Sequence, residues 1–559
     1  MQIIKTGVLL SVIMLVAACD PGQPGGRVEF SPGGAAAALT QSEYNQLPPE
    51  QQYQVAGKLL ATLFKGVPAE SFFDLSQVTD QLVVQDSNFL NNVRNALKTR
   101  LNPAERLAID IEIDGLDAEG NPDPDVAKYR FDTNGDAERN QRPRQIPLAR
   151  MREYPLSRDQ FVEWMAYFLA NTIMFSPAEE MESTDMNDVQ NMYRFLVDNL
   201  ERNNTIRQIV RSNLPSLARW RVSRSPENHA LEAFELYLGL FETEEDSYRG
   251  GIACKDLYLT DEDDGYLIRR NDFPNTEPQL ILGSSYVTSC DDLYDVIAGH
   301  PLLIPRVTEV IINYLMSGAP LETRTAMIAS ITASNPQTFA DIFTAILFSR
   351  EYLLNTERPK SFEENLFFLL DALKWDPRSP SAGELDELIF VRMTSTNVNN
   401  RIGLPAKGWA NMTYKIGRLP DVPLDGVSFA SYHKGLREEF LISAGGGNPT
   451  SGYGNTSYQG GNGTDGLFYD ANGDRQPVVQ DMTPETFLDF LFLSVLQRKP
   501  QPVEVTDLMA VIRDENGVNH LQTVDGVEVI RNDRYDNIAR IVFDYVSRLP
   551  EFYYFKAVN

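Results

Sequence analysis

Apolar residues recur at spacings of three and four through most of this 559-residue chain. Between Val55 and Phe64 this spacing places the apolar side chains on one face of a helix that begins near Pro49. The same pattern predicts helices at Phe161–Ile173, Met192–Leu200, Ala230–Leu240, Val307–Leu315, Phe339–Leu354, Phe362–Leu373, Phe487–Leu496 and Ile538–Val546. Strand patterns are few, and only Val524–Ile530 suggests a short hairpin with its neighbours. We expect an all-α fold of repeated helical modules, with long loops and little β-structure.

A five-residue motif, Asp-x-Asn-Gly-Asp, occurs twice, and the two segments that begin with it have similar residues at their boundaries. After each copy a polar residue suited to cap a helix, Ser157 or Thr483, precedes an apolar stripe, and Pro484 fits the first helical position. The copies begin at Asp132 and Asp470, and they close on similar segments, Ser212–Trp220 and Ser547–Phe555. We interpret this as an internal repeat in which each helical unit buries its apolar face on the next.

A third, more divergent copy of the repeat is suggested between these two. Ile342–Tyr352 resembles the closing helix, and Ser334-Asn335-Pro336 precedes it as a predicted cap. The acidic stretch Asp261–Gly265 would be its opening element.

The second copy of the acidic motif has the spacing of a calcium-binding loop. Asp470, Asn472 and Asp474 occupy positions one, three and five of an EF-hand-like loop, and Asp481 falls at position twelve, as in dockerin-type loops. Oxygen donors at alternating positions let the chain wrap around a hard cation. The loop departs from the pattern at position six, where Arg475 replaces the expected glycine.

The first copy is a weaker calcium loop. It supplies Asp132, Asn134 and Asp136, but Pro143 stands at position twelve. The alternative for either copy is an Asx-type turn that only reverses the chain. We expect calcium to act structurally, as a stabiliser of loops.

The first eighteen residues have the pattern of a bacterial lipoprotein signal. Lys5 is followed by the apolar run Val8–Val16, which is too short to span a bilayer, and Val16-Ala17-Ala18-Cys19 resembles a lipobox. We expect Cys19 to be lipidated and to hold the protein at a membrane of the cell envelope, because acyl chains on one cysteine contribute roughly 0.8 kcal/mol per buried methylene. The alternative is a plain secretory signal. Asp20 leaves the choice between inner and outer membrane open.

The other two cysteines, Cys254 and Cys290, form an even pair in an exported chain. A disulfide between them is the default prediction, and two separate buried thiols are the alternative. The sequence has no Cys-x-x-Cys-His motif, so we expect no covalently attached haem.

The chain is strongly acidic. Loss of the signal would remove one basic side chain, Lys5, from the total of 50, leaving 49 basic and 78 acidic side chains and a net charge of −29. This balance disfavours nucleic acid and electrostatic attraction to anionic lipid headgroups. Membrane attachment would come from the lipid anchor, and an envelope protein or polysaccharide is the expected partner.

No residue constellation identifies a reaction. His229, Glu232 and Glu235 would share a helical face, but a carboxylate-bridged metal pair needs a matching set elsewhere, so we interpret this segment as a surface helix. No catalytic residue is assigned.

The motifs and the changes of composition along the sequence divide the chain into seven segments. We expect a signal peptide at 1–18, a flexible tether at 19–48, a first helical domain at 49–245, a disulfide-closed loop region at 246–300, a second helical domain at 301–440, a Gly-rich loop with the calcium-like loop at 441–482, and a C-terminal helical module at 483–559.

Two segments resemble a known group of proteins. Ile342–Trp375, with Arg358-Pro359-Lys360, and Phe492–Pro500, followed by Glu504, are similar to uncharacterised helical families of secreted proteins in planctomycetes and marine proteobacteria. Some members are fused to c-type cytochromes, but the resemblance implies no active site.

The expected function is therefore that of a binding or assembly component of the envelope. One alternative is an envelope hydrolase acting on polymers, with Glu232, Glu235 or the loop around Asp261 in its active site. Another is an accessory partner of an exported redox protein.

Overall fold

The computed structural model describes residues 30–69, 87–114, 150–170, 172–174, 186–262, 265–372, 482–514, 520–531 and 534–558. This part of the chain is mostly helical, with a few short antiparallel strands. The helices are α1 (Gln41–Asn45), α2 (Pro49–Thr62), α3 (Phe89–Ala96), α4 (Pro103–Asp114), α6 (Arg158–Ala170), α8 (Met186–Glu201), α9 (Ile206–Asn213), α10 (Leu217–Ser223), α11 (Pro226–Leu238), α12 (Glu244–Ala253), α13 (Cys290–Gly299), α14 (Leu303–Leu315), α15 (Leu321–Ala333), α16 (Phe339–Leu347), α17 (Phe362–Ala372), α24 (Pro484–Leu496), α25 (Pro502–Asp514), α26 (Tyr535–Val546) and α27 (Pro550–Tyr553).

Every stripe predicted from the apolar spacing contains a helix within the described residues, and one stripe is divided. The stripe from Phe339 to Leu354 is divided, because α16 ends at Leu347 and a π-helical turn, η4 (Glu351–Asn355), follows it. Short 3₁₀ turns occur at η1 (Gly34–Ala36) and η3 (Cys254–Asp256).

The predicted caps at Ser157 and Thr483 are confirmed. The Ser157 hydroxyl accepts a hydrogen bond from the Gln160 backbone N–H at 3.2 Å, and Thr483 accepts one from Thr486 at 3.2 Å. The predicted cap at 334–336 is wrong, because α16 starts after Thr338, whose hydroxyl accepts from the Asp341 N–H while the Asp341 carboxylate accepts from the Thr338 N–H. This reciprocal pair satisfies two backbone donors that would otherwise have no partner.

The described strands form four two-stranded antiparallel pairs. They are β1 (Leu257–Glu262) with β2 (Gly265–Arg270), β3 (Gln279–Ile281) with β4 (Ser285–Val287), β5 (Arg358–Pro359) with β8 (Tyr554–Phe555), and β6 (Leu521–Val524) with β7 (Val527–Ile530). The last hairpin was predicted. The first was not: Asp261 and Glu262, expected to open a helical repeat, instead end β1, and Gly265 begins β2.

The β1–β2 hairpin forms because its residues alternate between two faces. Leu257, Leu259 and Ile268 pack against the core, whereas Tyr258 and Leu267 are exposed on the other face. This period of two is typical of a half-buried strand.

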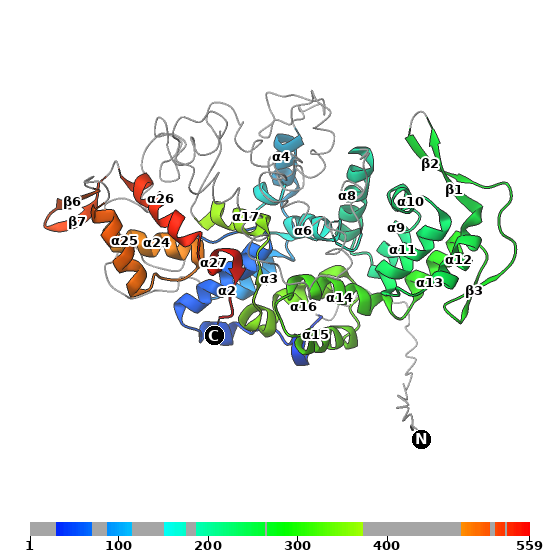
Figure 1. Cartoon of the computed structure of the whole chain (residues 1–559), viewed down its shortest axis with the longest axis horizontal. Helices are drawn as coiled ribbons and strands as arrows, with labels where there is room; N and C mark the ends of the chain where they lie inside the picture. The colour runs from blue at the N-terminus through cyan, green and yellow to red at the C-terminus, as the bar shows by residue number, and fades with distance from the viewer. Residues whose placement is uncertain are drawn as a thin grey trace, which may run out of the picture.

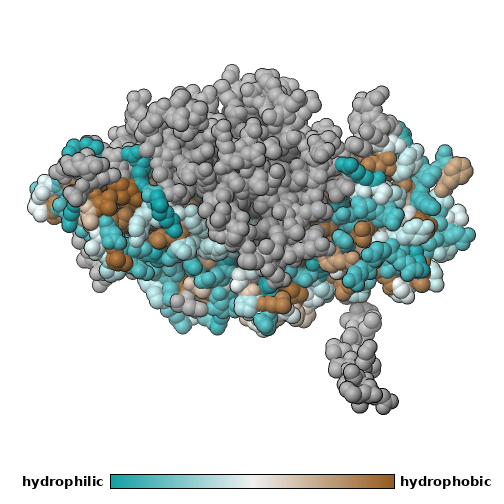
Figure 2. Space-filling view, in the orientation of Figure 1, coloured by the Kyte–Doolittle hydropathy of each residue, from teal (hydrophilic) through white to brown (hydrophobic). Residues whose placement is uncertain are grey.

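The described elements surround one continuous hydrophobic core that runs from Ala36 to Val558. Helices α9–α13 and strands β1–β4 lie at one end of the molecule, α24–α26 and β6–β7 at the other, and α2 and α14–α17 between them (Figure 1). Helix α17 contacts both α2 and α24, so it links the middle of the molecule to the C-terminal helices. On the face shown in Figure 2, hydrophilic residues cover most of the coloured surface, as expected for a net charge of −28.

The folded part of the chain begins earlier than expected. The predicted tether was to extend to residue 48, but Leu39 and Tyr44 are buried and α1 lies within that range. The Leu39 N–H donates to the Phe348 carbonyl at 2.8 Å, which attaches this segment to the middle of the chain. Composition suggested a linker because residues 20–40 are rich in Gly, Pro and Ala.

The predicted disulfide between Cys254 and Cys290 is present and fully buried. It joins η3 to the first residue of α13 and closes the region that contains both β1–β2 and β3–β4. Among the described helices, none combines the length and the apolar character needed to cross a bilayer.

Candidate functional site: a cationic pocket

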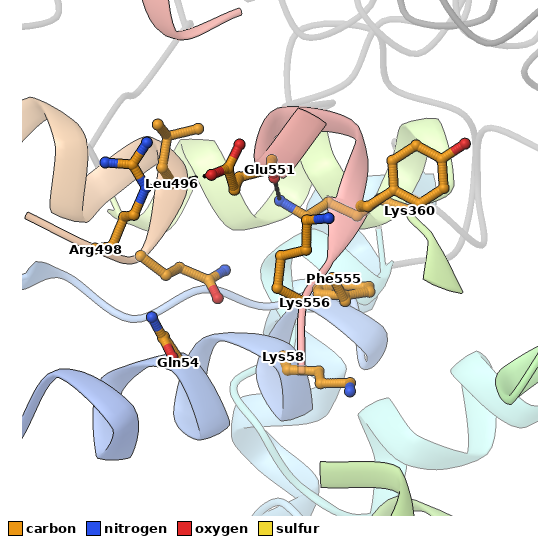
Figure 3. A pocket seen from close by; sticks show the side chains of 10 residues that line it. Gln54, Lys58, Lys360, Leu496, Arg498, Glu551, Phe555 and Lys556 are labelled. Carbon is orange, nitrogen blue, oxygen red and sulfur yellow. Dashed lines mark hydrogen bonds and ion pairs between the residues drawn. The ribbon is translucent and has the colours of Figure 1, made fainter. Parts of the chain in front are cut away.

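A pocket of about 190 Å³ lies where α2, the end of α24, and the C-terminal segment from α27 to β8 meet (Figure 3). Its basic lining residues, Lys58, Lys360, Arg498 and Lys556, come from four separate parts of the chain. Glu551 supplies a carboxylate, and Gln54, Leu496, Gln497, Tyr554 and Phe555 complete the lining. We call this the cationic pocket.

The pocket is held together by a buried ion pair on its inner side. Arg358 donates from Nη1 to Glu364 Oε2 at 2.9 Å and from Nη2 to Glu364 Oε1 at 2.5 Å. The Arg358 guanidinium also lies 4.6 Å from the centre of the Phe555 ring, and β5 pairs with β8 at the same place. A bidentate pair fixes both position and orientation, so it holds the C-terminal strand against α17.

The opposite wall repeats this geometry around Arg498. Arg498 donates from Nη1 and Nη2 to the two oxygens of Glu504 at 2.7 and 2.8 Å. In both pairs the glutamate follows the arginine by six residues, and the arginine also donates to the carbonyl of the next residue. The glutamate also accepts a backbone N–H three residues before it, from Ser361 in one pair and Gln501 in the other. The same local chain path therefore occurs at α17 and at α25.

A glycine on α2 allows this wall to approach closely. A Cβ on Gly57 would lie 2.6 Å from the Gln497 side-chain carbon Cδ, so a larger residue would displace the Gln497 side chain from its position. Gln497 itself adopts a left-handed conformation with φ of 61°, which ends α24 and turns the chain towards Arg498. The close approach of these segments places Gln497 at the pocket.

Lys360 lies in the wall with its side chain 4% exposed. Its Nζ donates to the Glu551 backbone carbonyl at 2.9 Å and lies 5.4 Å from the centre of the Phe555 ring. Burial lowers the pKa of the Lys360 ammonium to about 7, and Arg358 acts in the same direction, whereas Glu364 and Glu551 oppose it. The charge of Lys360 is therefore finely balanced near neutral pH.

Lys58 lies deeper, with 1% of its side chain exposed. Its Nζ donates to the Thr356 carbonyl and lies 5.0 Å from the centre of the Tyr352 ring. Burial, together with the charge of Arg358, lowers the pKa of Lys58 well below its ordinary value. Neither buried lysine forms an ion pair with a carboxylate among the described residues.

Hydrogen-bond donors outnumber acceptors in the pocket. Gln497 is 6% exposed, and its Nε2 has no hydrogen-bond partner among the described residues. Each buried lysine ammonium has three N–H donors, yet Lys58 and Lys360 each have a single recorded protein acceptor. Buried donors without partners are costly. This arrangement suits a ligand that brings acceptor oxygens, and above all an anionic one.

The positive charge of the pocket contrasts with that of the whole chain, in which acidic side chains outnumber basic ones by 28. A local field of this kind acts over a Debye length of roughly 8 Å at physiological salt. The pocket can therefore attract an anionic group at close range, although the molecule as a whole does not steer anions towards itself.

The residues predicted to hold metal or lipid lie outside the described residues. This applies to Cys19 and to both acidic loops, namely Asp132, Asn134 and Asp136, and Asp470, Asn472, Asp474 and Asp481. Within the described ranges, no group of three or more His, Cys, Asp or Glu side chains has the arrangement of a metal site. The calcium loops stay predictions.

The structure corrects the expected position of His229. It is fully buried rather than on a surface helix, with its ring stacked 4.6 Å from that of Trp220 and Nε2 3.0 Å from the Tyr294 hydroxyl. Burial lowers its pKa to about 3. Glu232 and Glu235, on the same helix, are only partly buried.

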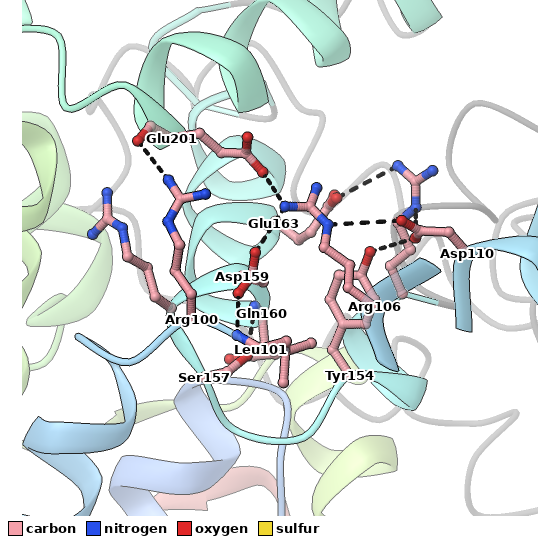
Figure 4. A network of polar contacts seen from close by, with 12 residues as sticks. Arg100, Leu101, Arg106, Asp110, Tyr154, Ser157, Asp159, Gln160, Glu163 and Glu201 are labelled. Atoms are coloured by element: carbon pink, nitrogen blue, oxygen red, sulfur yellow. Dashed lines mark hydrogen bonds and ion pairs between the residues drawn. The ribbon is translucent and has the colours of Figure 1, made fainter. Parts of the chain in front are cut away.

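A second polar cluster joins α4, α6 and α8 (Figure 4). Arg106 lies 2.7 Å from an oxygen of Asp159 and 2.6 Å from one of Glu201. Nearby, Arg150 lies 3.4 Å from both Asp110 and Glu163, and burial raises the pKa of Glu163. Each carboxylate in this cluster has a cationic partner, so its contacts are accounted for by packing between the helices.

Nothing in the amino-acid sequence points directly to the cationic pocket, because its lining residues come from four separate parts of the chain. One signal was present. The spacing from arginine to glutamate is the same at Arg358 and Arg498, and both segments had been singled out by their resemblance to secreted helical proteins. Neither the ion pairs nor the pocket between them was predicted from that spacing.

Comparison with known proteins gives no match: no family model, curated protein or solved structure is similar enough to this chain to be recognised.

Proposed function

We propose that this protein is a lipid-anchored, exported component of the cell envelope that binds an anionic ligand in the cationic pocket. The observation that carries the ligand assignment is the buried Gln497 Nε2, which has no partner among the described residues and lies beside basic side chains. Carboxylate, phosphate and sulfate groups all supply the required acceptor oxygens.

The size of the pocket limits the ligand. Typical sites for drug-sized molecules occupy roughly 300 to 1,000 Å³. A volume of about 190 Å³ suits a small anion, or the charged end of a longer molecule whose remainder extends into solvent. An acidic group at the end of an envelope polysaccharide or protein would meet this description.

The anchor part of the proposal rests on the lipobox at Cys19. Replacement of Cys19 by Ala would prevent acylation. We expect the wild-type protein to incorporate labelled palmitate and to sediment with membranes, and the variant to do neither. A variant that still incorporates the label would contradict the assignment.

Calcium loops and helical repeat modules belong to the same proposal. Calcium at Asp470–Asp474 and at Asp132–Asp136 would stabilise loops beside the helical modules rather than take part in chemistry. The modules would form the rigid frame that positions the pocket.

The binding function is tested by calorimetric titration of the purified protein with sodium sulfate. Gln497→Met removes the donor at nearly constant volume, and we expect it to weaken sulfate binding roughly ten- to one-hundredfold, the range for a hydrogen bond to a charged group. Lys499→Met is the matched control, because Lys499 pairs with Asp489 at 2.8 Å and does not line the pocket. Absence of sulfate and phosphate binding by the wild-type protein would refute the proposal.

A further inference from the structure

We infer that anion binding in the cationic pocket is coupled to the uptake of a proton by Lys360, so that the pocket retains its ligand at mildly acidic pH and releases it at alkaline pH. This inference rests on the proposed anion-binding function. It adds a mechanism by which the pH outside the cytoplasm would control occupancy of the site.

The hydrogen bonding of Lys360 carries the inference. Its Nζ has one recorded acceptor, the Glu551 carbonyl at 2.9 Å, and no carboxylate among the described residues lies within ion-pair distance of it. A charged ammonium at this position therefore has two N–H groups to offer to a ligand. An anion in the pocket would supply both the acceptors and the opposite charge.

The nearby carboxylates are already engaged by arginines. Glu364 on α17 forms two hydrogen bonds with Arg358, and Glu551 on α27 lies 3.4 Å from Arg498 Nε. The other charged or titratable groups that surround Lys360 are Arg358 from β5, Lys58 from α2, Arg498 after α24, and Tyr554 and Lys556 from β8 and the residue after it.

Burial lowers the pKa of Lys360 to about 7, and Arg358 adds a smaller effect in the same direction, whereas Glu364 and Glu551 oppose them. The pocket without a ligand therefore loses the Lys360 proton as the pH rises through neutrality. An anion in the pocket adds a negative charge beside Lys360 and favours the ammonium. By linkage, a ligand that raises the pKa of a group must itself bind more tightly when that group is protonated.

The other basic residues of the pocket are less suited to this role. Arg498 is held in its charged form by Glu504, which raises its pKa further. Lys556 is 44% exposed and lies 3.9 Å from Glu357 on the surface. Lys58 donates to the Thr356 carbonyl at a deeper position. Lys360 combines contact with the pocket and a pKa close to neutral.

Sulfate is the appropriate probe, because it keeps its double negative charge from pH 6 to pH 9. Calorimetry at pH 7.5 in two buffers of different ionisation enthalpy counts the protons taken up per sulfate bound. We expect net uptake of up to about three-quarters of a proton for the wild-type protein at this pH, and affinity that falls by up to about tenfold per pH unit above pH 7.

Lys360→Arg separates the two proposals, because arginine keeps its charge throughout this range. We expect this variant to bind sulfate with little proton uptake and little pH dependence, and Lys499→Arg to behave like the wild type. Sulfate binding by the wild type without proton uptake would overturn the inference and leave the anion-binding function intact. Uptake that persists in Lys360→Arg would place the proton elsewhere and also overturn it. No sulfate binding at all would refute the function itself, and thermal unfolding of each variant verifies that it is folded.

Discussion

Arg358 and Glu364 form an ion pair whose side chains are only 2% and 1% exposed, and both guanidinium Nη atoms contribute to it. Arg358 also donates from Nη2 to the hydroxyls of Thr62 and Tyr352 at 3.0 and 3.1 Å, so α2 and η4 are attached to the same group. One guanidinium thus links α2, η4 and α17, and its contact with the Phe555 ring adds β8.

Removal of one partner of this pair should be strongly destabilising. Arg358→Met leaves Glu364 buried without its counter-charge, and we expect the free energy of unfolding to fall by about 3 to 5 kcal/mol. The double variant Arg358→Met/Glu364→Met should recover most of this loss, because the Thr62 and Tyr352 hydroxyls also bond to each other at 2.6 Å. Urea unfolding measures both. Arg350→Met, which breaks the exposed pair with Glu43, is the control and should cost at most about 1 kcal/mol.

Neutralisation of Glu551 should strengthen anion binding. Its carboxylate lines the pocket and repels an anion, so Glu551→Gln should raise sulfate affinity up to about fivefold, the range for a partly exposed charge. The titration is carried out at pH 6. Lys360 is mostly protonated at this pH, even though loss of the Glu551 charge lowers the pKa of Lys360 further. Glu485→Gln removes the same charge from an exposed position on α24 and should leave the affinity unchanged. Equal effects of the two variants would indicate general electrostatics rather than a site.

Glu363 should make stability depend on pH. Its side chain is 2% exposed, Oε1 accepts from Tyr167 at 3.2 Å, and Oε2 has no hydrogen-bond partner among the described residues. Burial raises its pKa from 4.5 to about 7. Since the folded state holds this proton more tightly than the unfolded state, the contribution to stability is complete below pH 4.5 and is lost as the pH rises to 7.

Glu363→Gln removes this dependence. We expect the variant to gain stability relative to the wild type as the pH rises from 4.5 to 7, by up to about 3 kcal/mol, and to gain no more above pH 7. Chemical unfolding at half-unit pH steps measures the difference. A difference that does not vary with pH would show that Glu363 is not the titrating group.

Loss of the disulfide should destabilise the end of the molecule that carries β1–β4. Cys254 and Cys290 are 36 residues apart, and closure of such a loop stabilises a fold by about 4 kcal/mol on the chain-entropy model. We expect Cys254→Ala/Cys290→Ala to lose a similar amount in urea unfolding. Added reductant should destabilise the wild type but not the double variant, and a reductant effect on both would point to another cause.

Calcium should stabilise the protein if the acidic loops bind it. We expect millimolar calcium to raise the melting temperature and a chelator to lower it. Asp470→Asn/Asp474→Asn should reduce this shift more than Asp132→Asn/Asp136→Asn, because only the second loop has an acidic residue, Asp481, at position twelve. A melting temperature indifferent to calcium would remove the calcium proposal and leave the pocket unaffected.

The sequence predicted the helices well because their signal is local. Apolar spacing identified α2 and α24, hydroxyl groups at Ser157 and Thr483 marked helix starts, and an even pair of cysteines predicted the disulfide. Each of these signals lies within a few residues or follows from simple counting. Physical interactions that act over short distances along the chain can be recognised without a structure.

The features that the sequence did not reveal depend on distant contacts or on a misleading composition. The β1–β2 hairpin was not predicted, although Leu257 and Leu259 alternate with more polar residues. The cationic pocket needs Lys58, Lys360 and Arg498 to meet, and nothing local to any one of them predicts the others. Only the fold brings those charges together.

The pairing of β5 with β8 also affects the order in which the molecule can be completed. In the order of synthesis α2 precedes Tyr554 and Phe555, which line the far side of the pocket. Lys360 therefore lacks its acceptor, the Glu551 carbonyl, until the segment that contains α27 and β8 has been made. Ligand binding would then report that this segment has folded against α2 and β5, which a site built from one continuous segment could not do.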